Sequence, residues 1–235
     1  MLQKIILITG TTSGIGQAIM LKYLDENYRV ICLNRKPLPI NILNQYSDHI
    51  LEYILDLNQP HEIVTTCELI KKEISHINII VNNAGVMYPE NLAKEYMTEL
   101  QEMMNVNMIS PMIILSQLTS LLTSCKGIII NIGSLASYAP IPSQATYSCI
   151  KAGLSKFSDI IRQELNPLGI RVVELSPGST KSNILRHLEE DYIDQHDVNS
   201  EARLSTSDVA DTCFLITNLS PQTQVSRIVI EPLRS

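Results

Sequence analysis

The stretch IILITGTTSGIG, residues 5–16, decides which fold the chain can adopt. Four consecutive apolar residues, Ile5 to Ile8, predict a strand covered on both faces, because a half-exposed strand would alternate apolar and polar side chains. The strand runs directly into a glycine-rich turn, and a helical pattern begins at Gly14. A buried strand followed at once by a helix is typical of a parallel sheet.

Further apolar runs rich in Ile and Val repeat this arrangement. The predicted strands are Lys4–Thr9, Arg29–Asn34, Ile50–Leu55, Ile77–Asn82, Gly127–Ile132, Gly169–Ser176 and Ser226–Glu231. The predicted helices are Gly14–Asn27, His61–Ser75, Lys94–Thr123, Ser143–Asn166 and Ser207–Asn218. Because the two kinds of element alternate, we predict one α/β domain over residues 1–235. It is a Rossmann-type, doubly wound parallel sheet of about seven strands with helices on both faces.

Composition excludes several classes of protein. The 235 residues are 45% hydrophobic with a net charge of −6 and no block of like charge, which disfavours a nucleic-acid partner. No apolar run is long enough for a membrane partner to be expected. The five cysteines are scattered, so we expect reduced thiols, a cytoplasmic location and no metal site. The polar segment 179–203 lacks a strand pattern and is predicted to be a substrate lid, with a disordered loop as the alternative.

The glycine-rich turn predicts a phosphate-binding site. Glycines between a strand and a helix let backbone N–H groups approach a pyrophosphate, and the helix N-terminus adds partial positive charge. A tight turn without a ligand is the alternative, because the spacing G-x-x-x-G-x-G differs from the common dinucleotide fingerprint. The predicted contacts are Gly10, Thr12, Ser13, Gly14, Ile15 and Gly16.

The end of the second strand favours NADP(H) over NAD(H). It reads Asn34-Arg35-Lys36, with no carboxylate to bind a ribose 2′-hydroxyl and with a guanidinium suited to a 2′-phosphate. A solvated basic turn is the alternative. Asp56, followed by Leu57, can accept a hydrogen bond from the adenine amino group or simply form a turn. The small residues Asn83, Ala84 and Gly85 after the fourth strand leave room for the cofactor.

Tyr147 and Lys151 are the candidate catalytic pair. Positions i and i+4 share one helix face, so the phenol and the ammonium can stand together. An ammonium about 4 Å away would lower the pKa of the phenol by about three units at an effective dielectric of about 20. Ser134, at the end of the fifth strand, would reach the same edge of the sheet, with Ser137 and Ser143 as competitors.

Together, Tyr-x-x-x-Lys, a serine thirteen residues upstream and T-G-x-x-x-G-I-G resemble the short-chain dehydrogenase/reductase family. Asn-Asn-Ala-Gly and Pro177-Gly178 also occur in the family's order, so the resemblance covers nearly the whole chain. It implies Tyr147 as acid/base, Lys151 as the residue that lowers its pKa and holds the nicotinamide ribose, and Ser134 as the group that orients a carbonyl. Further implied site residues are Asn107, which would complete a tetrad, and Pro177, Gly178, Ser182 or Thr180 near the nicotinamide carboxamide.

Asn107 also has an argument from the residues. Pro111 lies four positions later in a predicted helix and has no N–H, so the carbonyl of Asn107 should lose its partner and the helix should kink. A water held by that carbonyl beside Lys151 would then connect Tyr147 to solvent.

The sequence therefore predicts an NADP-dependent oxidoreductase that reduces a carbonyl, with a small carbonyl or alcohol compound as its partner. The alternatives are an NAD-dependent alcohol dehydrogenase and a nucleotide-sensing protein without catalysis. The resemblance implies a homotetramer or homodimer built on the two longest helices, whose apolar rows can equally be core. The substrate walls are predicted at Met87, Tyr88, Leu135, Tyr138, Ile141, Pro142, Gln144 and the helix Asn183–His196.

Overall fold

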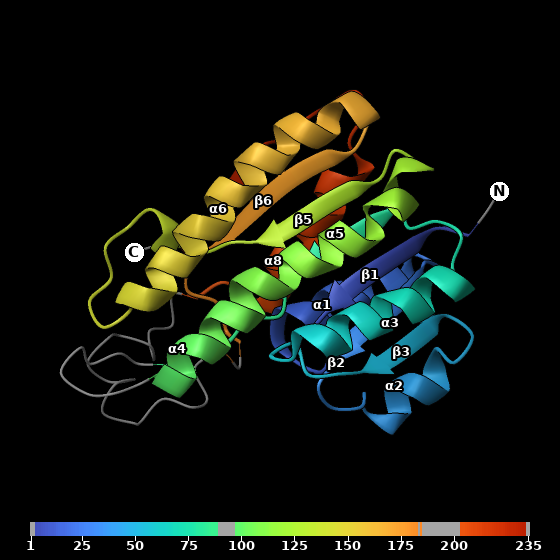
Figure 1. Cartoon of the computed structure of the whole chain (residues 1–235), viewed down its shortest axis with the longest axis horizontal. Helices are drawn as coiled ribbons and strands as arrows, with labels where there is room; N and C mark the ends of the chain where they lie inside the picture. Colours follow the sequence, from blue (N-terminus) through green and yellow to red (C-terminus); the bar gives the residue numbers. More distant parts are fainter. Residues whose placement is uncertain (1–2, 89–96, 183, 185–202, 234–235) are drawn as a thin grey trace.

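The computed structural model describes residues 3–88, 97–182, 184 and 203–233 and contains a seven-stranded parallel sheet (Figure 1). The strand order is β3-β2-β1-β4-β5-β6-β7, with the switch point between β1 and β4. The strands are β1 (Ile5–Thr9), β2 (Arg29–Asn34), β3 (Ile50–Ile54), β4 (Ile79–Asn82), β5 (Ile128–Ile132), β6 (Arg171–Pro177) and β7 (Arg227–Ile230). The predicted doubly wound fold is confirmed.

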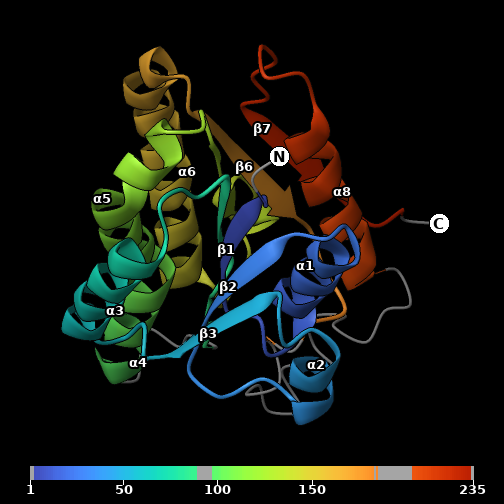
Figure 2. The same ribbon diagram turned by 90° about the vertical axis from the view of Figure 1, so that its right-hand side faces the viewer.

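Helices cover both faces of the sheet (Figure 2). One face carries α3 (Pro60–Glu73), α4 (Met97–Met104), α5 (Ser110–Thr123) and α6 (Ala145–Leu165). The other carries α1 (Gly14–Asp25) and α8 (Thr206–Asn218), with the short α2 (Ile40–Gln45) near the β3 edge. Short turns complete the described elements: η1 (Asn105–Ile109), η2 (Leu135–Ser137) and η3 (Asn166–Leu168).

Alternating side chains of each strand explain why the strands are apolar throughout. Ile6 and Ile8 of β1 belong to the core under α1 and α8, whereas Ile5 and Leu7 belong to the core under α3 and α5. All four side chains are buried. A sheet with two buried faces leaves no position for a polar repeat.

Several predicted boundaries differ from the structure. The strands expected from Ile77 and Gly127 begin at Ile79 and Ile128, because the preceding residues form connecting turns. Helix α2 was not predicted, since six residues between prolines and a polar turn are too few to show helical periodicity. The helix expected over Lys94–Thr123 is described from Met97 and consists of α4, η1 and α5.

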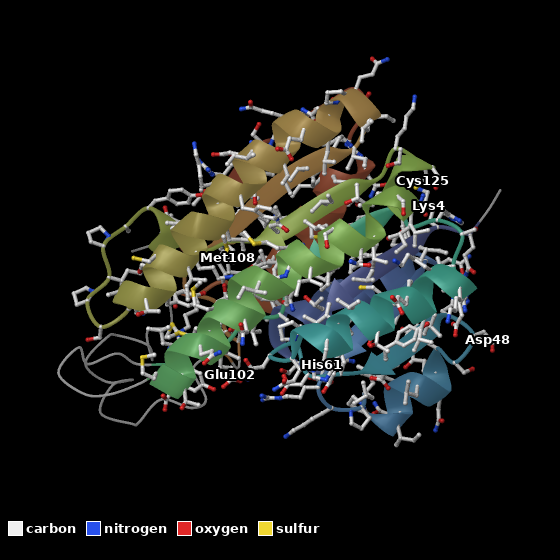
Figure 3. The ribbon with its side chains drawn as sticks, in the orientation of Figure 1. Lys4, Asp48, His61, Glu102, Met108 and Cys125 are labelled. Atoms are coloured by element: carbon white, nitrogen blue, oxygen red, sulfur yellow. The ribbon has the colours of Figure 1, made fainter. Side chains whose placement is uncertain are left out.

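The irregular part of this long helix lies where the sequence predicts a kink. Residues Asn105–Ile109 form a π-helical turn, in which the Ser110 N–H donates to the carbonyl of Asn105. The turn stands directly before Pro111, which has no N–H to continue a regular ladder. The helix continues through the turn (Figure 1), so the disruption takes the form of a wider turn. Met108 of this turn, labelled in Figure 3, lies next to Gly153 of α6, because a Cβ added to that glycine would come within 3.3 Å of the methionine Cε.

Among the described residues, the run Met97–Thr123 is long and apolar enough to cross a membrane, with a mean hydropathy of 1.4. Part of this run is core. Ile114, Leu115, Leu118 and Leu122 are buried beneath α3 and α5, whereas Met97 stays exposed. Core packing accounts for the buried part of the run.

One buried carboxylate joins the edge strand to the sheet. Glu174 of β6 has no exposed surface and accepts hydrogen bonds from Ser155 Oγ at 2.8 Å, Ser176 Oγ at 2.9 Å and Arg227 Nε at 2.9 Å. The hydroxyl of Tyr138 donates to the same carboxylate. Arg227 belongs to β7, so this cluster holds β7, α6 and the turn after β5 together.

We predict that Glu174→Gln lowers the free energy of unfolding by about 3 kcal/mol, because it removes the charge of a buried carboxylate from its ion pair with the partly exposed Arg227 and points an N–H group at hydrogen-bond donors. Urea unfolding followed by circular dichroism measures the change. The control is Glu164→Gln, which removes a carboxylate from the exposed surface of α6 and should alter stability by less than about 0.5 kcal/mol. Equal effects of the two substitutions would contradict the prediction.

Candidate active site

The carboxyl ends of the parallel strands surround a cavity of about 950 Å³. Its walls come from the turns after β1 to β6 and from helices α4 and α6. The predicted site residues that line it are Gly10, Thr12, Ser13, Gly14, Ile15, Gly16, Arg35, Asp56, Leu57, Asn83, Ala84, Gly85, Ser134, Tyr147, Lys151, Pro177, Gly178, Thr180 and Ser182. Asn34 and Asn107 lie behind this wall.

The glycine-rich turn has the geometry of an anion cradle. Gly10 and Gly14 have φ of +73° and +60°, a backbone region that residues other than glycine rarely adopt. A Cβ on Gly16 would lie 2.1 Å from the carbonyl oxygen of Gly10, so only glycine lets α1 begin this close to β1. Ser13 caps the helix without a side-chain hydrogen bond. The first N–H groups of α1 are therefore available to a ligand in the cavity.

Asn34 supports this turn from behind. Its Oδ1 accepts from the Thr11 N–H at 2.8 Å and the Thr11 hydroxyl at 2.9 Å, while its Nδ2 donates to Glu52 Oε1 at 2.9 Å. The side chain is buried and does not line the cavity. The expected cofactor contact is thus replaced by a positioning role, because both ends of the amide are engaged within the protein.

Asn83 holds the turn from the other side. Its Nδ2 donates to the carbonyls of Thr9 at 2.9 Å and Gly10 at 3.1 Å. In return, Thr9 Oγ1 accepts from the N–H groups of Asn83 at 3.0 Å and Ala84 at 2.9 Å. The ends of β1 and β4 are therefore fixed at the sheet's switch point, where open α/β sheets bind ligands.

The basic end of β2 faces the same cavity. Arg35 and Lys36 both line it, and Arg35 NH1 lies 3.3 Å from Glu102 Oε1 of α4. Asp56 lines it as well, and its Oδ1 accepts from the Asn58 N–H at 2.9 Å. The turn-forming role of Asp56 is therefore present, and its place in the wall leaves it available to a ligand.

Tyr147 and Lys151 are both buried on the first turns of α6. Lys151 Nζ donates to the Ile132 carbonyl at 2.8 Å and lies 5.8 Å from the centroid of the Tyr147 ring. Burial raises the pKa of Tyr147 to about 12, although its hydrogen bond with Ser134 acts in the opposite direction. The predicted three-unit lowering by Lys151 is wrong for this state, because the loss of hydration on burial dominates the pKa of the phenol.

Burial also lowers the pKa of Lys151, to about 8, although the negative charge of Glu174 raises it. Both groups of the pair are thus displaced toward their neutral forms, as expected when water is removed from ionisable groups.

Ser134 is held in place by the turn that it begins. It is the N-cap of η2, and its Oγ accepts from the Ala136 N–H at 3.1 Å. Neither Ser137 nor Ser143 lines the cavity, which leaves Ser134 as the serine beside Tyr147. Ser143 does not cap α6 either, because that helix begins at Ala145 with Gln144 as its N-cap.

Asn107 holds the segment that follows β4. Its Oδ1 accepts from the Val86 N–H and its Nδ2 donates to the Val86 carbonyl, both at 2.8 Å. A Cβ on Gly85 would lie 3.3 Å from Asn107 Oδ1 and 4.0 Å from Lys151 Nζ, so the asparagine stands near the lysine behind Gly85. The predicted water relay through its backbone carbonyl stays a prediction.

The predicted substrate wall is partly assembled. Met87, Leu135, Ile141, Gln144 and Ile184 line the cavity, whereas Tyr88, Tyr138 and Pro142 do not. Tyr138 instead directs its hydroxyl at Ser155 and Glu174. Most of the predicted lid 179–203 lies outside the described residues, as does nearly all of Asn183–His196.

Other residues of the cavity wall were not predicted from the sequence. Four of them lie at or just after the carboxyl ends of strands: Leu33, Leu55, Ile132 and Gly133. Their positions could have been predicted, because the carboxyl ends of parallel strands face the ligand crevice. Glu102 and Val106 come from the long helix, and no local pattern marks them as cavity residues.

A comparison with protein families agrees with this geometry. The model for the family described as short chain dehydrogenase matches residues 4–193. The chain belongs to this family. It is a family of oxidoreductases, and the resemblance predicted from the sequence is confirmed.

Curated relatives extend the comparison. The chain is 30% identical to the short-chain dehydrogenase srdE of Neurospora crassa over 78% of its own length, and 28% identical to a 3-oxoacyl-[acyl-carrier-protein] reductase of Buchnera aphidicola, with 83% of the chain and 80% of the relative aligned. An uncharacterized oxidoreductase of Staphylococcus epidermidis is 24% identical, with 98% of each chain aligned. The chain spans 63% of the Neurospora protein and 50% of a rat estradiol 17-beta-dehydrogenase 2.

Solved structures share the fold. A closed form of serine dehydrogenase complexed with NADP+ superposes with a TM-score of 0.88 at 24% identity, covering 97% of this chain and 94% of that one. A 3-ketoacyl-(acyl-carrier-protein) reductase of Brucella melitensis complexed with NADH gives 0.84 at 21% identity, covering 97% and 96%. Both cofactors therefore occur among proteins of this shape.

The lowered pKa of Lys151 predicts a pH-dependent stability. The unfolded lysine titrates near 10.5 and the folded one near 8, so between these values the unfolded state binds more protons and stability rises with pH. In Lys151→Met the side chain at position 151 does not titrate. Relative to this variant, the free energy of unfolding of the wild type should increase by about 2 kcal/mol between pH 7 and pH 9.5. Unfolding both proteins at each pH cancels other titrations. A pH-independent difference would contradict the shift.

Proposed function

We propose that this chain is an NADP(H)-dependent reductase of a small carbonyl compound. The observation that carries the proposal is the meeting of Ser134, Tyr147 and Lys151 with the glycine cradle in one cavity. The raised pKa of Tyr147 supports reduction, because a phenol that stays protonated at neutral pH is ready to act as an acid.

The residues present fit a dinucleotide. The cradle around Gly10 offers backbone N–H groups and a helix N-terminus to a pyrophosphate, and its missing Cβ atoms permit close approach. Asp56 and Leu57 would hold the adenosine end, and Asn83, Ala84 and Gly85 would lie along the ribose side. Pro177, Gly178, Thr180 and Ser182 would face the nicotinamide. When bound, the cofactor supplies the hydride.

The protein's own groups act on the substrate oxygen. The Ser134 hydroxyl donates a hydrogen bond to the carbonyl oxygen and stabilises the negative charge that develops there. The Tyr147 hydroxyl transfers its proton to the same oxygen. The resulting phenolate is stabilised by the ammonium of Lys151, whose position is fixed by the Ile132 carbonyl.

Preference for NADP(H) is supported by Arg35 and Lys36 in the cavity wall. NADP-bound neighbours support it and an NADH-bound neighbour weakens it. An NAD-dependent alcohol dehydrogenase is therefore the second candidate, favoured by the carboxylate of Glu102 next to Arg35. A nucleotide sensor without catalysis is the third, which the assembled catalytic residues oppose.

Further parts of the proposal concern the setting of the enzyme. The apolar wall of Met87, Leu135 and Ile141 supports a mostly apolar substrate, and relatives named as reductases support a carbonyl. We also propose one domain, substrate specificity in the lid 179–203, a cytoplasmic location and a homodimer or homotetramer, as family membership favours.

We predict that Tyr147→Phe lowers kcat for carbonyl reduction at least about 100-fold, because the proton donor is lost. The dissociation constant for NADPH should change less than about threefold, since a ring of the same shape remains. A panel of carbonyl compounds read by NADPH absorbance measures kcat, and calorimetric titration measures NADPH binding, with Tyr46→Phe at the C-cap of α2 as the control. Retained turnover would rule out the proposed acid.

We predict that Arg35→Ala weakens NADPH binding about tenfold and changes NADH binding less than about twofold, because the guanidinium would contact the 2′-phosphate, which NADH lacks. Titration of the two nucleotides by calorimetry measures this. The matched control is Arg29→Ala, which removes a cation from the opposite end of β2. Equal losses for NADPH and NADH would favour the NAD-dependent alternative.

A further inference from the structure

One ion pair stands across the adenosine side of the cavity. Arg35 follows β2 and Glu102 belongs to α4, and the two side chains meet with NH1 and Oε1 3.3 Å apart. Both residues line the cavity. Figure 3 shows Glu102 on α4, at the end of the molecule toward which the strand arrows point. The guanidinium expected to bind a 2′-phosphate therefore already has an anionic partner.

The two partners differ in how firmly they are held. The Arg35 side chain is 58% exposed, whereas that of Glu102 is 17% exposed. Glu102 also accepts a 2.7 Å hydrogen bond from the hydroxyl of Tyr88 through its second oxygen, Oε2. Burial and Glu102 together raise the pKa of Tyr88 to about 12, so the phenol remains a donor at neutral pH. Glu102 is therefore the more buried member of the pair and has a second hydrogen bond, whereas Arg35 is the more exposed member.

A carboxylate beside Arg35 affects a 2′-phosphate in two ways. It occupies the guanidinium that the phosphate needs, and it repels the phosphate's negative charge. The same carboxylate is also a hydrogen-bond acceptor, which is the type of group that recognises the ribose 2′-hydroxyl of NAD(H). All of these effects reduce the preference for NADP(H) over NAD(H).

We propose that Glu102 is a specificity-determining residue that competes with the 2′-phosphate for Arg35 and so limits the preference of this chain for NADP(H). The proposal rests on the proposed role of Arg35 in cofactor binding. The hydrogen bond from Tyr88 keeps the Glu102 carboxylate beside Arg35, so a bound 2′-phosphate has to compete with it for the guanidinium.

The test uses binding to the cofactor-free protein and no turnover. Calorimetry measures the dissociation constants of adenosine 2′,5′-bisphosphate and adenosine 5′-phosphate for the wild type and Glu102→Gln, which can still accept from Tyr88. The bisphosphate should bind about two- to fivefold more tightly to Glu102→Gln, as expected for a partly exposed ion pair, and the monophosphate should be unchanged. Unchanged bisphosphate affinity would overturn the proposal.

Two further variants separate competition from simple charge repulsion. In an Arg35→Ala background, Glu102→Gln should no longer tighten bisphosphate binding. A gain that persists there would overturn competition for the guanidinium. The matched control is Glu99→Gln, which removes the same charge one turn earlier on α4 and should leave the ratio of the two affinities unchanged. An equal gain from it would also overturn the proposal.

These results remain distinguishable from failure of the proposed function. If the wild type binds the bisphosphate no better than the monophosphate and Glu102→Gln restores a difference, the preference for NADP(H) fails while the role of Glu102 stands. If no variant distinguishes the two nucleotides, both fail. If the wild type discriminates strongly and Glu102→Gln adds nothing, only the role of Glu102 fails.

Discussion

The approach of α1 to the end of β1 is the constraint on which the rest of this site depends. Gly16 lies against the carbonyl of Gly10 at a distance that no Cβ tolerates, and the amide of Asn83 fills the remaining space. That contact turns the N-terminus of α1 toward the cavity, next to the end of β4, which pairs with β1. A ligand site follows because backbone donors lie where the connections after β1 and β4 leave toward opposite faces of the sheet (Figure 2).

Burial determines the protonation states of the proposed catalytic pair. Tyr147 and Lys151 are each moved toward the neutral form because burial removes the water that would stabilise their charged forms. Glu174 compensates from the neighbouring strand and also holds β7 through Arg227. The stability of the edge strand and the charge of the lysine thus depend on one carboxylate.

Features set by local spacing could be predicted from the sequence. The strand runs, the glycine turn and Tyr147 with Lys151 all follow from patterns within a few residues. Features that depend on distant partners could not be predicted. Asn34 forms hydrogen bonds with Thr11 and Glu52, and Arg35 forms an ion pair with Glu102, 67 residues later. The predicted direction of the Tyr147 pKa shift is wrong for the same reason, since the burial of the phenol depends on the assembled fold.

The π-helical turn at Asn105–Ile109 carries one residue more than a regular helical turn. That residue sets the rotation between α4 and α5. With it, Glu102 reaches Arg35 and Asn107 reaches Val86, while Ile114 and Leu118 remain in the core. Deleting it would rotate α4 against α5 by about 100°. Either Glu102 would then turn away from Arg35, or the apolar side chains of α5 would turn out of the core. The chain can therefore lose a residue from many surface loops more easily than from this turn.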